Sequence, residues 1–184
     1  MNSKRIFLGI PVNAEIKEKV TEIQQELQQI EGGWKIVQPN NLHLTLKFLG
    51  EVKEEKIEKI KEKIASLNLG KPFQVKVKTI GVFPNEDYIT VIWFGLEDKE
   101  QIFYLHKQID FALSKLFPIE KDFLAHVTLA RVKFIKDKPK FKQFLIKHKN
   151  IDLGEMTINK VILYESKLEK EGPVYSILEE FELK

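Results

Sequence analysis

Two of the four histidines in this chain begin the same short pattern, in which a threonine follows two positions later and apolar residues alternate with the pair. The first pattern is His43-Leu44-Thr45-Leu46 and the second is His126-Val127-Thr128-Leu129. Because side chains alternate along a β-strand, the histidine and threonine of each pattern are expected on one face. The other face is left for the core; in the first strand it carries Leu42, Leu44, Leu46 and Phe48.

A pair of such motifs suits displacement at phosphorus without a metal ion. One neutral imidazole can take a proton from an attacking water, while one protonated imidazole gives a proton to the departing oxygen. The unperturbed pKa of histidine lies near neutrality, so an acid and a base of this kind can coexist. The hydroxyls of Thr45 and Thr128 can donate hydrogen bonds to phosphate oxygens where charge develops.

The elements that must position the two motifs repeat along the chain. A shift of 83 residues carries His43 onto His126, and each half then reads strand, helix, strand, helix, strand. Two similar units about an approximate two-fold axis would bring the motifs face to face across a cleft. The sequence therefore predicts a bilobal α+β domain over 1–184, with antiparallel sheets lining a central cleft and helices outside. Its two halves are 1–83 and 84–166, followed by a C-terminal strand at 174–183.

Hydrophobic periodicity supplies the element boundaries. Apolar residues at helical spacing predict helices over 16–30, 57–67, 98–117 and 140–147. Runs rich in Val, Ile, Phe and Thr predict strands over 5–10, 42–50, 73–83, 88–95, 124–134, 156–166 and 174–183.

Composition excludes several classes of protein. The chain has 184 residues and a net charge of +3, so any contact with nucleic acid must be a local site. It contains no cysteine, which excludes disulfides, thiol nucleophiles and cysteine-ligated metals. Lys4 and Arg5 precede a short apolar run, as in a minimal signal peptide, but Pro11 interrupts that run. We interpret it as the first strand of a cytoplasmic protein with no membrane-spanning segment.

The paired motifs and their flanking residues resemble the two-histidine (2H) phosphoesterase superfamily, and specifically its RNA 2′,3′-cyclic phosphodiesterases, also called 2′-5′ RNA ligases. The resemblance covers nearly the whole chain. It includes Arg5-Ile6-Phe7, Trp34, the run from Asn41 to Gly50, Gly81-Val82-Phe83-Pro84, the run from Ala125 to Arg131, and Gly172-Pro173-Val174-Tyr175.

This resemblance implies opening of a terminal 2′,3′-cyclic phosphate on RNA to leave a 2′-phosphate. It also implies that His43 is the general acid toward the leaving 3′-oxygen and that His126 is the general base on water. The sequence itself leaves these two roles interchangeable. The family is further associated with joining RNA ends through 2′-5′ linkages, which implies RNA, including tRNA halves, as partner. No metal or nucleotide cofactor is implied, and we expect a monomer.

Three further residues are candidates for contact with substrate. Arg131 is one of only two arginines beside 28 lysines, and its guanidinium can grip a phosphate through two bonds. Strict alternation from His126 puts Arg131 on the wrong strand face, and a β-bulge would resolve this. Trp34 and Tyr175 could either stack on a nucleobase or pack against the core. His106 and His148 receive no role.

Two alternatives remain open on the sequence alone. One is a phosphodiesterase for a small cyclic nucleotide, such as a cyclic phosphate of ADP-ribose. The other is an RNA-binding module without turnover, although binding needs no matched acid and base. A lysine-rich stretch either guides an RNA backbone or is a solvated face; it comprises Lys133, Lys136, Lys138, Lys140, Lys142, Lys147 and Lys149.

Overall fold

A computed structural model describes residues 3–170 and 172–184 of the chain. Met1, Asn2 and Glu171 of the predicted 1–184 domain lie outside the described residues. The helices are α1 (Ala14–Gln28), α2 (Glu54–Ala65), α3 (Glu100–Ala112) and α4 (Lys138–His148), with a 3₁₀ turn at Pro39–Asn41. The strands are β1 (Ser3–Pro11), β2 (Gly32–Ile36), β3 (His43–Lys53), β4 (Phe73–Pro84), β5 (Ile89–Glu97), β6 (His126–Ile135), β7 (Asp152–Ile158), β8 (Lys160–Glu169) and β9 (Gly172–Glu182).

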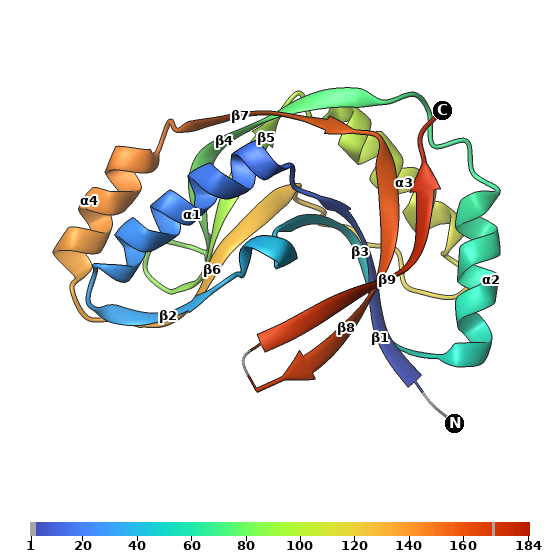
Figure 1. Ribbon diagram of the computed structural model, residues 1–184, viewed down its shortest axis with the longest axis horizontal. Coiled ribbons are helices and arrows are strands. Elements are labelled where there is room, and N and C mark those ends of the chain that lie inside the picture. The colour runs from blue at the N-terminus through green and yellow to red at the C-terminus, as the bar shows by residue number, and fades with distance from the viewer. Residues whose placement is uncertain (1–2, 171) are drawn as a thin grey trace.

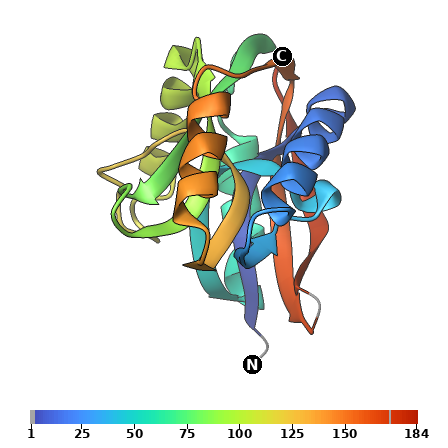
Figure 2. The ribbon, with the colours of Figure 1, turned by 90° about the vertical axis from the view of Figure 1, so that its left-hand side faces the viewer.

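All the strands belong to one curled antiparallel sheet in the order β7-β4-β5-β6-β3-β1-β8-β9, with β2 added beside β6. α4 and α1 lie toward one end of the molecule, where they contact β4, β6 and β7 (Figure 1). α2 and α3 lie toward the other end, where they contact β3 and, for α2, also β9. Viewed from the α4 end, this helix lies in front of the sheet (Figure 2). The α+β class and the antiparallel strands predicted from the sequence are confirmed.

The two halves of the sheet meet where β3 approaches β6, and only one residue pair, Leu44 with Val127, is in register there. Both side chains are fully buried, so each strand turns this face into the core. The motif residues on either side of Leu44 and Val127 point the other way. Because the strands are antiparallel, this crossing brings the two motifs together in opposite directions.

The third strand of each predicted half pairs with the first strand of the other half. β4, from the first half, is bonded to β5, and β8, from the second half, is bonded to β1. The sequence shift of 83 residues therefore relates elements that are interleaved within one sheet. The crossing of β3 and β6 joins the antiparallel strands of the two halves into one continuous sheet.

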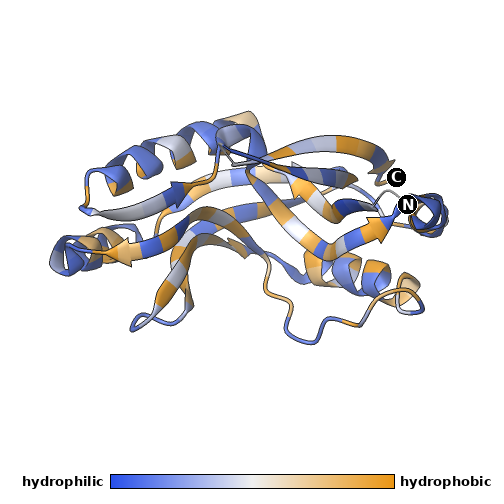
Figure 3. Ribbon diagram, turned by 90° about the horizontal axis from the view of Figure 1, so that it is seen from below, coloured by the Kyte–Doolittle hydropathy of each residue, from blue (hydrophilic) through white to orange (hydrophobic). Residues whose placement is uncertain are grey.

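Local sequence accounts for most elements but leaves some differences. Asn13 caps α1 through its side-chain oxygen, which accepts a hydrogen bond from the backbone N–H of Ile16 at 3.0 Å. Three helices end earlier than the periodicity predicts, since α1 stops at Gln28, α2 at Ala65 and α3 at Ala112. β2 was not expected, and the single strand predicted at 156–166 is two strands, β7 and β8. Hydrophobic and hydrophilic segments alternate along the strands, as Figure 3 shows.

No helix in the described ranges has both the length and the apolar character that crossing a bilayer requires.

Candidate active site

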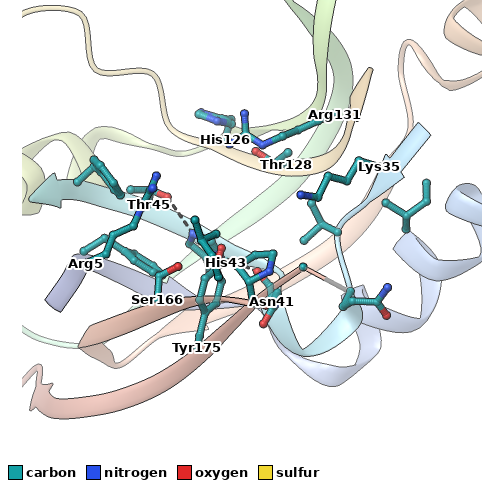
Figure 4. A pocket seen from close by; sticks show the side chains of 18 residues that line it. Arg5, Lys35, Asn41, His43, Thr45, His126, Thr128, Arg131, Ser166 and Tyr175 are labelled. Carbon is teal, nitrogen blue, oxygen red and sulfur yellow. Dashed lines mark hydrogen bonds between the residues drawn. The ribbon is translucent and has the colours of Figure 1, made fainter. Parts of the chain in front are cut away.

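A pocket of about 430 Å³ opens where the two motifs meet, and strands from both halves of the sheet line it (Figure 4). His43, Thr45, His126 and Thr128 all face into it. The lining contains three basic side chains, from Arg5, Lys35 and Arg131, and no aspartate or glutamate of the described residues. A site with cations and hydroxyls but no carboxylate favours an anionic ligand.

A bulge follows the threonine in each motif and changes which side chains face the pocket. In β3, Thr45 pairs with Gly9 and Lys47 with Leu8, so Leu46 is the extra residue. In β6, Thr128 pairs with Trp93 and Ala130 with Ile92, so Leu129 is the extra residue. Beyond each bulge the alternation is reversed.

This reversal turns Arg131 into the pocket. It is the bulge that the sequence analysis needed to place Arg131 on the same face as His126. The reversal also corrects the expectation for Phe48, which was assigned to the core. Phe48 is 53% exposed and lines the pocket, whereas Lys47 beside it is only 3% exposed.

His43 is held by hydrogen bonds at both ring nitrogens. Its Nδ1 lies 2.6 Å from the backbone oxygen of Asn41, which can only accept, so Nδ1 carries a proton. Its Nε2 lies 2.9 Å from the hydroxyl oxygen of Thr45. The rings of Phe7 and Tyr175 pack against the imidazole, with centroids 4.7 and 5.3 Å away. Burial lowers the pKa of His43, the bond to Asn41 opposes this shift, and the nearby charge of His126 adds to it.

His126 is oriented in the same manner from the other strand. Its Nδ1 donates to the backbone oxygen of Leu124 at 2.8 Å, which aims Nε2 at the pocket. The ring of Phe83 meets it edge to face, with centroids 5.1 Å apart. Burial lowers the pKa of His126; the bond to Leu124 opposes this shift, the positive Arg131 lowers the pKa further, and Glu120 raises it.

Among the residues predicted from the sequence, the two histidines, the two threonines, Arg131 and Tyr175 line the pocket. Trp34 does not. Its indole N–H donates to the backbone oxygen of Ile30 at 2.8 Å, and its ring stacks on Phe141 with centroids 5.5 Å apart. Of the two possibilities left open for Trp34, the structure shows packing.

Several lining residues were missed by the sequence analysis, namely Arg5, Lys35, Asn41, Phe48 and Ser166. Arg5 carried a usable signal, since it is the only arginine other than Arg131. Lys35 is hidden among 28 lysines. Asn41 contributes through its backbone oxygen to His43 and through its side-chain amide, which donates to the backbone oxygen of Pro173 at 2.6 Å.

The two remaining histidines lie outside the pocket. His106 is buried, its Nδ1 donates to the backbone oxygen of Leu46 at 2.8 Å, and its ring stacks on Phe123 with centroids 3.8 Å apart. His148 is buried near Glu26, with Nε2 3.0 Å from a carboxylate oxygen. Within the described ranges there is no group of three or more potential metal ligands.

A buried ion pair behind β3 fastens the segment that leads to His126. Lys47 is bonded to the carboxylate of Asp110, and the two residues are 3% and 4% exposed. Lys47 also donates to the backbone oxygen of Pro118 at 2.9 Å, and the other oxygen of Asp110 accepts from the backbone N–H of Glu120 at 3.0 Å. The chain from α3 to β6 is thereby tied to the core below the first motif.

The family model described as LigT like Phosphoesterase matches residues 10–93 and 95–175, which include both motifs. The chain belongs to this family. As a LigT-like phosphoesterase, it is 40% identical over 178 residues to the RNA 2′,3′-cyclic phosphodiesterase of Methanocaldococcus jannaschii, a match that covers 96% of this chain and 99% of the relative. It is 34% identical over 181 residues to the protein of that name from Methanothermobacter thermautotrophicus, covering 97% and 98% of the two chains.

Solved structures share this fold. A crystal structure of a Thermus thermophilus protein has a TM-score of 0.83 and 30% identity, and the match covers 97% of both chains. The crystal structure of Escherichia coli LigT complexed with 3′-AMP has a TM-score of 0.81 and 22% identity, and it covers 99% of both chains. At that identity the E. coli structure shows the shared fold alone.

Proposed function

We propose that this LigT-like phosphoesterase hydrolyses 2′,3′-cyclic phosphate ends of RNA to 2′-phosphomonoesters by paired-histidine acid–base catalysis. Its similarity over nearly its full length to RNA 2′,3′-cyclic phosphodiesterases makes it a hydrolase of this class. The observation that carries the mechanism is the pair of imidazoles at one pocket, each with Nδ1 bonded to a backbone oxygen. This bonding turns both Nε2 atoms toward the pocket for proton transfer, and Nε2 of His43 contacts the hydroxyl of Thr45 there.

In the proposed reaction, Nε2 of His126 takes a proton from water as the water oxygen bonds to phosphorus. The bond between phosphorus and the 3′-oxygen breaks, and protonated His43 gives its Nε2 proton to that oxygen. Thr45 and Thr128 donate hydrogen bonds to the non-bridging oxygens, and Arg131 balances their charge. The 2.9 Å contact between His43 and Thr45 supports this arrangement, because it keeps the acid and one phosphate donor side by side.

The same pair supports joining of RNA ends. A 5′-hydroxyl of a second RNA end takes the place of water, loses its proton to His126 and bonds to phosphorus. The bond between phosphorus and the 3′-oxygen breaks, His43 gives its proton to that oxygen, and a 2′-5′ linkage is left. We propose RNA ends of the kind carried by tRNA halves as natural substrates, and we expect the protein to act as a cytoplasmic monomer without a cofactor.

Turnover of three cyclic phosphates tests the substrate class. We expect kcat/KM to be highest for an oligonucleotide 2′,3′-cyclic phosphate, lower for a mononucleotide 2′,3′-cyclic phosphate, and lowest for a cyclic phosphate of ADP-ribose. The reason is that the basic lining of the pocket offers more cations than one phosphate requires. Faster turnover of the ADP-ribose compound would point to a small-nucleotide enzyme, and binding of RNA without turnover would point to a non-catalytic module.

The pH at which kcat/KM is highest is expected to change when Arg131 is replaced. Both histidine pKa values lie below the ordinary 6.5, so the bell-shaped profile of kcat/KM should have its maximum on the acid side of pH 6.5. Arg131→Gln removes a charge that disfavours protonated His126, so the pKa of His126 should rise and the maximum should move to higher pH. The rate should also fall about 10²–10³-fold, as when one donor to a developing charge is lost.

Lys133→Gln is the matched control for Arg131→Gln, because Lys133 lies two residues along the same strand, is exposed and does not line the pocket. Full pH–rate profiles for the wild type and the two variants, recorded on both sides of neutrality, show whether the charge of Arg131 sets the pH of the maximum rate. An Arg131→Gln profile that coincides with that of Lys133→Gln would remove Arg131 from the site.

A further inference from the structure

The only two arginines of the chain both line the pocket, whereas the chain has 28 lysines, of which only Lys35 lines it in the part that the structure describes. Arg131 stands on β6 just beyond the bulge of the second motif. Arg5 stands on β1, the strand that pairs with the first motif. An arginine offers a planar guanidinium with five N–H donors, which lysine cannot reproduce. Both positions therefore indicate recognition of a planar or forked anion.

Arg5 supplies a guanidinium where the first motif has none of its own. The shift of 83 residues that relates the motifs carries Phe48 onto Arg131, and the equivalent bulges turn both side chains into the pocket. The guanidinium carbon of Arg5 lies 5.0 Å from the centre of the Phe48 ring. The ring of Phe48, which corresponds to Arg131 under this shift, thus holds the guanidinium of Arg5 at its face.

The guanidinium of Arg5 has no carboxylate partner among residues 3–170 and 172–184. Glu51, its cross-strand neighbour, instead accepts a hydrogen bond from Ser3. Stacking on Phe48 occupies one face of the guanidinium and leaves its N–H edge for a ligand. Ligand sites are oriented by a small number of such polar groups that converge on a cavity.

The two guanidinium groups come from opposite sides of the crossing between β3 and β6, since Arg131 lies on β6 and Arg5 lies on β1. Arg131 lies on the same strand as His126 and Thr128 and lines the pocket with them, and its charge lowers the pKa of His126. The charges of both arginines lower the pKa of Tyr175 against the larger, opposite effect of burial. In Figure 4, Arg5 lies on the far side of Thr45 from Lys35, with Ser166 between Arg5 and Tyr175.

We infer that Arg5, stacked on Phe48, binds the phosphodiester group that precedes the terminal nucleotide. This contact makes the site selective for polynucleotide ends over mononucleotides. This inference rests on the proposed function. It assigns Arg131 to the cyclic phosphate and Arg5 to the adjacent backbone phosphate. A mononucleotide 2′,3′-cyclic phosphate with a free 5′-hydroxyl has no such phosphate and cannot use Arg5.

The test compares two substrates, adenosine 2′,3′-cyclic phosphate and the dinucleotide ApA with a 2′,3′-cyclic phosphate end. For each protein, the ratio of kcat/KM for the dinucleotide to kcat/KM for the mononucleotide is measured. Arg5→Gln is expected to lower this ratio about 10- to 100-fold, the range for loss of a charged hydrogen bond. The dependence of log kcat/KM on log salt for the dinucleotide should become shallower by about one unit.

Two further variants complete the test. Phe48→Leu removes the aromatic support and should lower the ratio in the same direction, while Lys56→Gln removes an equal charge from the exposed surface of α2 and should leave the ratio unchanged. Thermal unfolding midpoints establish that each variant is folded. A ratio unchanged in Arg5→Gln, or equal losses on both substrates, would overturn the inference. Failure of the wild-type protein to turn over either substrate would instead overturn the proposed function.

Discussion

Replacing His43 or His126 with alanine is expected to lower kcat by about 10²–10⁴-fold each, while RNA binding and the fold persist. The reason is that each imidazole has one nitrogen committed to a backbone oxygen and the other in the pocket, so neither can replace the other. Because the two act in one step, the double variant should lose little more than the single ones. Single-turnover kinetics with a cyclic phosphate RNA measure this loss directly.

A matched control is His148→Ala, since His148 is buried at a distance from the pocket and contacts Glu26. This variant should lose stability and keep kcat. If either His43→Ala or His126→Ala retained a rate near that of the wild type, the proposed acid–base pair would be wrong.

The separate roles of the two histidines can be resolved with a sulfur leaving group. A substrate in which sulfur replaces the bridging 3′-oxygen needs no general acid, because a thiolate departs readily. With this substrate the loss caused by His43→Ala should shrink strongly, and the loss caused by His126→Ala should remain. The opposite pattern would exchange the assigned roles.

Replacing Asp110 with alanine is expected to cost about 3–5 kcal/mol in the free energy of unfolding, because buried Lys47 then loses its carboxylate partner in the core. The same change frees the backbone N–H of Glu120, and with it the segment that leads to His126. We therefore expect kcat to fall as well. Urea unfolding monitored by fluorescence gives the stability, and single-turnover kinetics give the rate.

The pair can be tested further by removing both charges at once. Lys47→Met combined with Asp110→Leu should recover most of the lost stability, since apolar residues of similar volume often replace a buried ion pair without loss. The rate should stay low in the double variant, because no side chain then holds the Glu120 amide. An Asp110→Ala protein that unfolds at the wild-type urea concentration would show that the pair contributes no stability.

Much of the active centre follows from local sequence, because alternation along a strand needs only neighbouring residues. His43, Thr45, His126 and Thr128 share one face by this rule, and the structure agrees. The rule fails one residue past each threonine, where a bulge reverses it. A bulge depends on pairing with strands elsewhere in the chain, here β1 and β5, so the spacing of the motif alone does not reveal it.

The elements that the sequence analysis missed also depend on pairing with strands that are distant along the chain. β2 is five residues long and half-buried, so it shows no clear alternation and is stabilised by its pairing with β6. The exchange of β4 and β8 between the halves also rests on contacts between residues distant along the chain. Most core positions were predicted, because apolar periodicity reflects burial. Phe48 was wrongly assigned to the core, and Lys47 was missed because its partner, Asp110, lies on α3.

In the proposed mechanism, two histidines open a cyclic phosphate by acid–base catalysis at this pocket. The most direct test incubates the purified protein, in excess EDTA, with an RNA oligonucleotide that ends in a 2′,3′-cyclic phosphate, and resolves the 2′- and 3′-monophosphate products. We predict rapid conversion to the 2′-phosphate that persists in EDTA and is lost in His43→Ala and His126→Ala. Formation of the 3′-phosphate, or RNA that binds and is not converted, would contradict the account.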